Sequence, residues 1–221
     1  TEQYYLRARY YNPIVGRFMQ EDVYQGDGLN LYAYCKNNPV IYYDPSGYGR
    51  KIPYEVILNF KEGNAFNAKH RPNFKYNEVR VEANDEKKPY YVVDSYSPPY
   101  ETTIKKTING KNVYEKILIP GEIVSRKHTQ FNEIQLETAY GYLSEAKNKY
   151  ASGKNILDIQ FNPNILKNTK LDGNLYLDVP YQNSSISQEI LSKAESLGIK
   201  IREVEDLSKE ELEKIRGKSC E

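Results

Sequence analysis

A change in tyrosine content divides this 221-residue sequence and limits what it can fold into. Ten of its 22 tyrosines lie within the first 48 residues, and this Tyr-rich part closes with the stretch YYDPSGY at residues 42–48. An ordinary mixture of apolar and charged residues follows. The sequence therefore predicts two modules, residues 1–48 and residues 49–221.

Composition excludes several classes of protein. The hydrophobic fraction of 39% and charged fraction of 28% are typical of a folded domain with a core. No run approaches the ~18 apolar residues of a membrane span, so we expect none. The first module carries four Lys or Arg against five Asp or Glu, which is not a basic nucleic-acid tail. Cys35 and Cys220 lie in different modules, and the two histidines lack ligand spacing, so neither a disulfide framework nor a zinc site is predicted.

Three motifs in succession fill the first module. They are YYLRARYYNPIVGRF from Tyr4, GDGLNLYAYCKNNPV from Gly26 and YYDPSGY from Tyr42. Aromatic and basic residues alternate over residues 4–11, which predicts a strand that ends at the turn Asn12-Pro13. Over residues 4–48 the series resembles the C-terminal end of the RHS (YD-repeat) core-associated family.

This resemblance implies a processing site as well as a fold. In the RHS family, YD repeats build a β-cocoon around a variable C-terminal effector, and an aspartyl autoprotease releases that effector. The resemblance makes Asp22 and Asp44, which lie 22 residues apart, the catalytic pair, and Tyr48-Gly49 the scissile bond. Two nearby carboxylates can share a proton and act as an acid and base pair. The alternative is structural: Asp44 starts a turn and Asp22 is a loop carboxylate.

The chain departs from the family in two respects. Where the family often has a first Asp-Pro-x-Gly, this chain has DVYQG from Asp22. The repeats that would build the cocoon are also absent from these 221 residues, so the resemblance does not require that this chain is cleaved.

The second module has the pattern of a mixed α/β (α+β) domain. We expect helices at residues 53–60 (ending near Gly63), 129–150, 187–197 and 208–216. We expect strands at residues 77–83, 90–94, 102–108, 113–119, 121–128, 175–180 and 199–204. Asn109-Gly110 predicts a tight hairpin turn, and Ser97-Pro98-Pro99 predicts a break in the sheet.

The order of these elements resembles the restriction-endonuclease-like fold of PD-(D/E)xK nucleases. There an Asp on one strand and an acid with a Lys on the next hold a divalent metal and activate a water. The resemblance implies Asp94, Glu122 and Lys127 as catalytic residues, with Asp94 and Glu122 as metal ligands. Hydrolysis of a negatively charged phosphodiester needs a cation, typically Mg²⁺. His128 joins the catalytic set, and Arg126 and Gln130 are the expected phosphate contacts.

The second acid is the open point of this assignment. The family places acid and Lys two residues apart, but position 125 is Ser, and Glu122 and Lys127 should face opposite ways on a regular strand. Either Glu122 reaches in through a distortion, or another acid replaces it. The candidates are Glu55, Glu78, Glu133 and Glu137. The residues RKH at 126–128 are equally typical of a solvated strand end.

Together, the two resemblances imply a toxin with a nuclease domain. It would be secreted or delivered from the cell surface, held inactive by a cognate immunity protein and its own RHS cocoon, and act on nucleic acid in the cytoplasm of a competitor. One rival is an ADP-ribosyltransferase toxin in which Arg80 and Glu203 hold the dinucleotide, although the Ser-Thr-Ser strand typical of that class is missing. The other is a non-enzymatic binding module.

Overall fold

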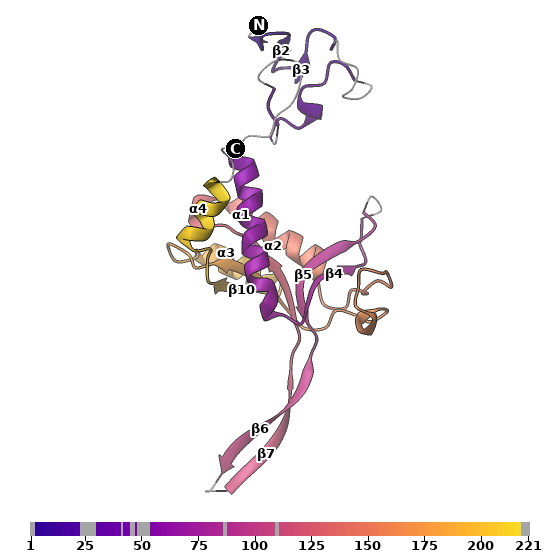
Figure 1. Cartoon of the computed structure of the whole chain (residues 1–221), viewed down its shortest axis with the longest axis vertical. Helices are drawn as coiled ribbons and strands as arrows, with labels where there is room; N and C mark the ends of the chain where they lie inside the picture. The colour runs from indigo at the N-terminus through magenta and orange to yellow at the C-terminus, as the bar shows by residue number, and fades with distance from the viewer. Residues whose placement is uncertain are drawn as a thin grey trace. The chain divides into compact units, whose positions relative to one another are not determined.

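The computed structural model describes residues 3–22, 30–40, 42–44, 47, 54–85, 88–108 and 111–217 (Figure 1). The chain forms two compact units, residues 1–61 with 214–221, and residues 62–213. The module boundary predicted between Tyr48 and Gly49 lies outside the described residues. Within the described part of the chain, no helix has both the length and the apolar character needed to cross a bilayer.

Three short antiparallel strands organise the N-terminal unit. They are β1 (Tyr4–Tyr5), β2 (Tyr10–Asn12) and β3 (Arg17–Phe18). The continuous strand expected over residues 4–11 is wrong, because the chain reverses between β1 and β2. Arg7 has a φ of 65°, and the Leu6 N–H donates to the Arg9 carbonyl at 2.9 Å. The reversal turns the Arg9 side chain into the unit, where the residue is buried.

A five-stranded mixed sheet forms the centre of the second unit, in the order β10-β9-β8-β5-β4. Its strands are β4 (Tyr76–Val81), β5 (Tyr91–Ser97), β8 (Glu122–Arg126), β9 (Asn174–Pro180) and β10 (Ile199–Val204). The strands β4, β5 and β8 are antiparallel neighbours, whereas β8, β9 and β10 run parallel. The α/β class, the mixed sheet and the pairing of β4 with β5 are confirmed.

Helices supply the crossovers that parallel strands require. Helix α2 (Leu136–Tyr150) connects β8 to β9, and α3 (Gln188–Ser196) connects β9 to β10. Ser187 caps α3 by accepting the Ile190 N–H at 3.4 Å. The last helix, α4 (Lys209–Gly217), follows β10. The sequence therefore located both C-terminal helices to within one or two residues.

One apolar cluster joins these helices to the sheet. Leu143 of α2 and Ile190 of α3 belong to it together with Ile123 of β8 and Leu177 of β9, and none of the four is more than 4% exposed. Burying each such side chain contributes about 1.5–3 kcal/mol. The middle of β5 and the end of β8, where the candidate site residues lie, therefore belong to a well-packed sheet.

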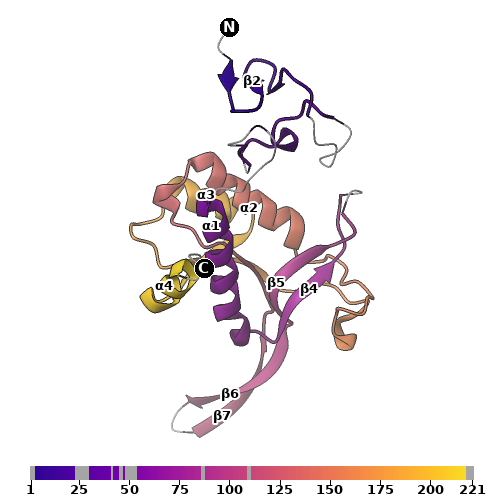
Figure 2. The ribbon, with the colours of Figure 1, turned by 45° about the horizontal axis from the view of Figure 1, so that its top comes forward.

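A long hairpin forms a sheet of its own. It consists of β6 (Tyr100–Ile108) and β7 (Lys111–Ile119), which pair antiparallel from Tyr100 opposite Ile119 to Ile108 opposite Lys111. Pro98 and Pro99 cannot donate to a sheet ladder, so they separate β5 from β6 as predicted. Figures 1 and 2 both show the hairpin extending away from the five-stranded sheet. The predicted turn, Asn109-Gly110, lies outside the described residues.

Two predicted helix boundaries are wrong. Helix α1 (Tyr54–His70) continues past Gly63, because Glu62, Phe66 and His70 are buried at four-residue spacing and the packed side of the helix goes on. Helix α2 begins at Leu136 rather than at residue 129.

The late start of α2 follows from hydrogen bonds made by Gln182. The side chain of Gln182 accepts the Phe131 N–H at 2.8 Å and donates to the Thr129 carbonyl at 3.1 Å. These bonds satisfy backbone groups outside a helix, and a 3-10 turn over Phe131–Glu133 follows. The apolar periodicity of the sequence does not report such a contact.

Candidate active site

Asp94 lies on β5 next to Ser95, which pairs with Val124 and is the last residue at that end of the β5–β8 pairing. Its carboxylate accepts the Arg126 N–H at 2.7 Å and the Asn67 side-chain amide at 3.3 Å. Burial raises the pKa of Asp94, and these donors with the positive charges of Arg126 and Lys127 only partly oppose that rise. A carboxyl held against its charged form is typical of functional sites.

Lys127, the first residue after β8, pairs with an acid that the sequence did not single out. Its Nζ lies 3.0 Å from Glu145 Oε2 on α2 and 5.0 Å from the centroid of the Tyr142 ring. The other oxygen of Glu145 binds Lys149. The side chains of Lys127 and Glu145 are 31% and 36% exposed, so solvent and ligands can reach this pair.

Glu145 is held in its charged form. Burial acts to raise the pKa of Glu145, but hydrogen bonds from Lys149 and Lys127 outweigh it and leave the pKa below its ordinary value. The two carboxyls of the site therefore differ, because the pKa of Asp94 is raised and that of Glu145 is lowered.

Tyr150, in the last turn of α2, is affected by the charges of both acids. Burial raises the pKa of its hydroxyl, and the negative charges of Asp94 and Glu145 raise it further. Lys127 and Glu145 are thus in contact where the end of β8 meets the second half of α2, and the charge of Asp94 on β5 acts on both Lys127 and Tyr150. The available signal was the helical spacing of Tyr142, Glu145 and Lys149, which puts all three on one face of α2.

Glu122 belongs to a different cluster. Its carboxylate lies 3.1 Å from Arg202 Nη1, and Arg202 also makes two bonds with Asp178, at 2.8 and 3.2 Å. The alternation of side chains along β8 puts Glu122 on the same face as Arg126, so Lys127 takes the acid of α2 instead. Across the described residues, no three His, Cys, Asp or Glu side chains gather as metal ligands. The predicted pairing of Asp94 with Glu122 on a metal receives no support from this arrangement.

Arg126 lies in the interior rather than at a substrate surface, because the residue is only 7% exposed. It donates to Asn67 at 2.7 Å and to Ser95 at 2.8 Å, and its guanidinium lies over the Phe74 ring. Burial lowers its pKa, against the opposing charges of Asp178 and Asp94. A phosphate could not reach this side chain without rearrangement of the strand ends.

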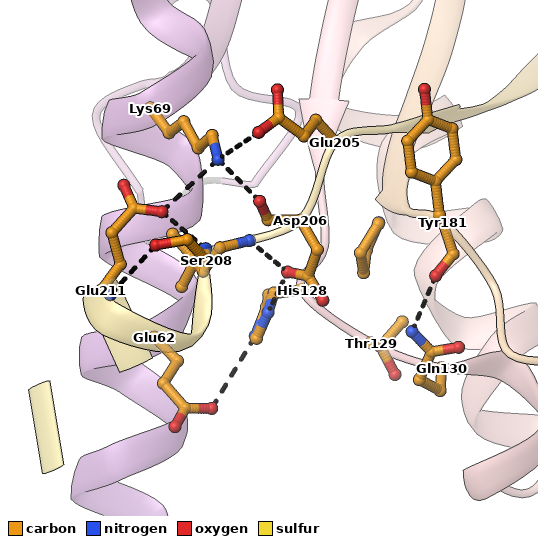
Figure 3. A network of polar contacts seen from close by, with 12 residues as sticks. Glu62, Lys69, His128, Thr129, Gln130, Tyr181, Glu205, Asp206, Ser208 and Glu211 are labelled. Carbon is orange, nitrogen blue, oxygen red and sulfur yellow. Dashed lines mark hydrogen bonds and ion pairs between the residues drawn. The ribbon is translucent and has the colours of Figure 1, made fainter. Parts of the chain in front are cut away.

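His128 and Gln130 connect segments of the chain (Figure 3). His128 Nε2 lies 2.9 Å from Asp206 Oδ1, and Nδ1 lies 4.0 Å from Glu62 on α1. Gln130 donates to the Tyr181 carbonyl at 3.0 Å and accepts the Asn183 N–H at 2.8 Å. The contacts of both side chains are with α1 and with the loops after β9 and β10. The structure therefore does not gather them with Asp94 and Lys127.

The two residues proposed for the transferase alternative lie far apart. Arg80 is on β4 and Glu203 is on β10, which are the opposite edges of the five-stranded sheet. Strands are spaced about 4.8 Å apart, so four spacings separate these backbones by roughly 19 Å. A single nicotinamide-binding pocket built from both residues does not fit this sheet order.

The two candidate autocleavage aspartates of the N-terminal unit meet at Arg9. Arg9 Nη2 lies 2.8 Å from Asp22 Oδ2 and 3.9 Å from Asp44 Oδ2, and all three side chains are 4–9% exposed. The guanidinium also lies over the Phe18 ring, 3.7 Å from its centroid. Asp44 Oδ1 accepts the Gly47 N–H at 2.8 Å, which is the turn role considered for it.

Arg9 is the residue of this second site that the sequence analysis missed. Its only sequence signal was its place in the alternation of aromatic and basic residues. The proposed scissile pair, Tyr48 and Gly49, lies outside the described residues.

Comparison with known proteins finds relatives of a part of the chain. Over 63 residues, or 28% of this chain, it is 44% identical to toxin subunit YenC1 of Yersinia entomophaga. Over 58 residues, or 26%, it is 47% identical to toxin protein Tse5 of Pseudomonas aeruginosa. The matched parts make up only 6% and 4% of those two proteins. No family model and no solved structure matches. The chain therefore shares a segment with two proteins that are named as toxins.

Proposed function

We propose that this chain is the C-terminal part of an RHS-type polymorphic toxin and that residues 49–221 are a metal-dependent nuclease. The toxin role is supported by the similarity to two named toxins and by the succession of motifs over residues 4–48. The nuclease role is carried by one observation, the contact between Lys127 and Glu145, with the charge of Lys127 acting on the half-buried carboxyl of Asp94.

The arrangement of elements supports a restriction-endonuclease-like assignment. A helix is followed by three antiparallel strands of the sheet, β4, β5 and β8, and a crossover helix then leads to the parallel strand β9. Asp94 lies on the second of these strands, as in PD-(D/E)xK nucleases, and Lys127 lies one residue beyond the third, the strand on which those enzymes carry their Lys. Ser125 occupies the usual acid position on the third strand, and Glu145 supplies a carboxylate from the helix in its place.

Carboxylate oxygens are the ligands that a hard divalent cation prefers, which supports Mg²⁺ as the cofactor of this site. The carboxylates of Asp94 and Glu145 would hold Mg²⁺, which needs only one or two protein carboxylates and keeps several waters. When bound, the cation would neutralise phosphate charge and lower the pKa of a coordinated water. Lys127 would then release Glu145 and steady the charge that develops on the phosphate oxygens.

The test uses the whole chain with plasmid DNA and with total RNA, each in Mg²⁺ and in EDTA. We expect Mg²⁺-dependent hydrolysis that falls by about 10²–10³-fold in Lys127→Ala. Lys147→Ala on the exposed side of α2 is the matched control and should keep the original rate. Intact nucleic acids after incubation with well-folded chain would refute the nuclease assignment, and label transfer from nicotinamide dinucleotide would be the next assay.

We also propose that Asp22 and Asp44 act in release of the effector at Tyr48-Gly49, with Arg9 as the residue that positions both carboxylates. The distances from Arg9 to the two aspartates support this proposal. Intact-mass spectrometry compares the chain with Asp44→Asn. Any cleavage product should begin at Gly49 and be absent from the variant, so the same product from Asp44→Asn would contradict the assignment.

The remaining parts of the proposal concern partners and place of action. A toxin of this kind would be delivered to a competing cell, act in its cytoplasm and be neutralised in its producer by a cognate immunity protein. These statements follow from the toxin assignment alone, and co-expression with the candidate immunity protein tests them through survival of the producing cell.

A further inference from the structure

The hairpin of β6 and β7 has two faces of different chemistry. Pairing places residues of the two strands directly opposite one another, so the register assigns each side chain to a face. One side, here called the groove face, consists of Glu101, Thr103, Lys105, Thr107, Asn112, Tyr114, Lys116 and Leu118. The other, the apolar face, includes Tyr100, Ile104, Val113, Ile117 and Ile119, together with Lys106, Lys111 and Glu115. Each face carries two Lys and one Glu, and the groove face differs by its larger number of hydrogen-bonding groups.

Positive charge is concentrated on this hairpin. Residues 100–119 carry four Lys against two Glu, a net charge of +2, whereas the whole chain carries +1. Lys106 forms an ion pair with Glu115 on the apolar face. Lys105 and Lys116 lie on the groove face, are exposed, and have no ion pair with another described residue. Two of the three hairpin lysines without a described ion pair, Lys105 and Lys116, therefore lie on the groove face, and the third, Lys111, lies on the apolar face.

The dimensions of the hairpin match one groove of one nucleic acid. Nine residues per strand, at about 3.3 Å each, give a length near 30 Å, or roughly one turn of duplex DNA. The major groove of B-DNA, about 12 Å wide, admits a two-stranded ribbon, whereas the minor groove, about 6 Å wide, is too narrow. A-form RNA closes its major groove to such an element.

We propose that the β6–β7 hairpin binds the major groove of duplex DNA through its groove face. This deepens and rests on the proposed nuclease function, because it names double-stranded DNA as the substrate class. The hairpin strands are continuations of the site strands: β5, which carries Asp94, leads into β6, and β7 leads into β8 and Lys127. DNA held by the hairpin would therefore lie along the same strands that present the candidate active site.

Binding measurements with paired variants test the proposal. The whole chain, in EDTA so that nothing is cut, is titrated against DNA and RNA duplexes of about three helical turns at several salt concentrations. One double variant, Lys105→Gln with Lys116→Gln, removes two charges from the groove face. The other, Lys106→Gln with Lys111→Gln, removes two charges from the opposite face of the same hairpin.

The proposal predicts a difference between these two variants. The groove-face variant should lower the slope of log affinity against log salt by about 2, because each lost phosphate contact removes about one unit. The matched variant should retain the original slope, and RNA should bind more weakly than DNA. The proposal would be overturned if the two variants had equal slopes, if neither variant lost slope, or if RNA bound as tightly as DNA. A protein partner on the apolar face would then be the remaining assignment.

The readout separates this proposal from the one on which it rests. Binding in EDTA needs no hydrolysis, so an inactive chain that still binds DNA through Lys105 and Lys116 would refute the nuclease function alone. A chain that cuts nucleic acid and shows no groove-face dependence would refute the hairpin assignment alone.

Discussion

At the scale of single residues, the candidate site differs from the expected sequence pattern in the origin of one carboxylate, which comes from Glu145 on α2 rather than from position 125 on β8. Ser125 stands on β8 where PD-(D/E)xK nucleases have an acid, and it is buried and cannot hold a metal as a carboxylate would. Glu145 reaches Lys127 from α2 instead, at 3.0 Å. The proposed nuclease chemistry requires a carboxylate near Lys127 and Asp94, and a helix packed beside the strand can provide it as well as the strand itself.

The place of Glu145 in the candidate site predicts that Glu145→Gln loses hydrolytic activity. We expect hydrolysis to fall by about 10²–10³-fold, because Gln removes one of the two carboxylates proposed to hold the cation that stabilises the transition-state charge. Glu137→Gln, an exposed acid on the same helix, is the control and should leave the rate unchanged. Because Glu145 is partly exposed, thermal unfolding of both variants should resemble that of the unaltered chain. Equal rates in the two variants would remove Glu145 from the site.

The raised pKa of Asp94 predicts how stability changes with pH. An acid with a raised pKa favours the fold below its ordinary pKa of 3.8, and this contribution is lost as pH rises through the raised value. Asp94→Asn removes the titration. The stability of this variant relative to the unaltered chain should therefore increase between about pH 4 and about pH 7. Urea unfolding at both pH values measures it, and a relative decrease with pH would contradict the burial of the charge.

At the scale of elements, buried ion pairs join three strands. Asp178 of β9, 1% exposed, lies between Arg202 of β10 and Arg126 of β8. Glu122 closes the cluster through Arg202. Each member faces a partner of opposite charge, which explains why residues that the sequence offered as catalytic or phosphate-binding are occupied within the sheet.

Breaking this cluster should be costly. Asp178→Ala leaves two arginines without their shared partner and should lower the free energy of unfolding by about 3–5 kcal/mol. Asp158→Ala, which removes the 57%-exposed partner of Lys167, should cost about 0–1 kcal/mol. Urea unfolding compares the two. A similar small loss from both would mean that the buried cluster does not stabilise the sheet.

The elements themselves were largely predictable, and their ends were not. Alternation and β-branched residues located the sheet strands, and Ser187 with Gly198 marked both ends of α3. The start of α2 depends on Gln182, which lies about fifty residues away in sequence, and Arg9, just after the turn at Arg7, makes its ion pairs with Asp22 and Asp44. Such long-range contacts leave no periodic signal.

At the scale of the whole molecule, the same limit applies to the site. The order of helices and strands, the mixed sheet and the positions of Asp94 and Lys127 within it could be read from local patterns. The acid on α2 and the diversion of Glu122 to Arg202 could not, because both arise from packing between separate segments. Sheet order also separates Arg80 from Glu203, which weakens the transferase alternative in a way no local pattern could.

The most direct test of the account compares two carboxylates. The whole chain, Asp94→Asn and Glu122→Gln are assayed side by side for Mg²⁺-dependent hydrolysis of plasmid DNA. The account predicts that Asp94→Asn loses activity, whereas Glu122→Gln, which removes only a partner of Arg202, keeps it. Loss of activity in Glu122→Gln together with full activity in Asp94→Asn would contradict the site described here.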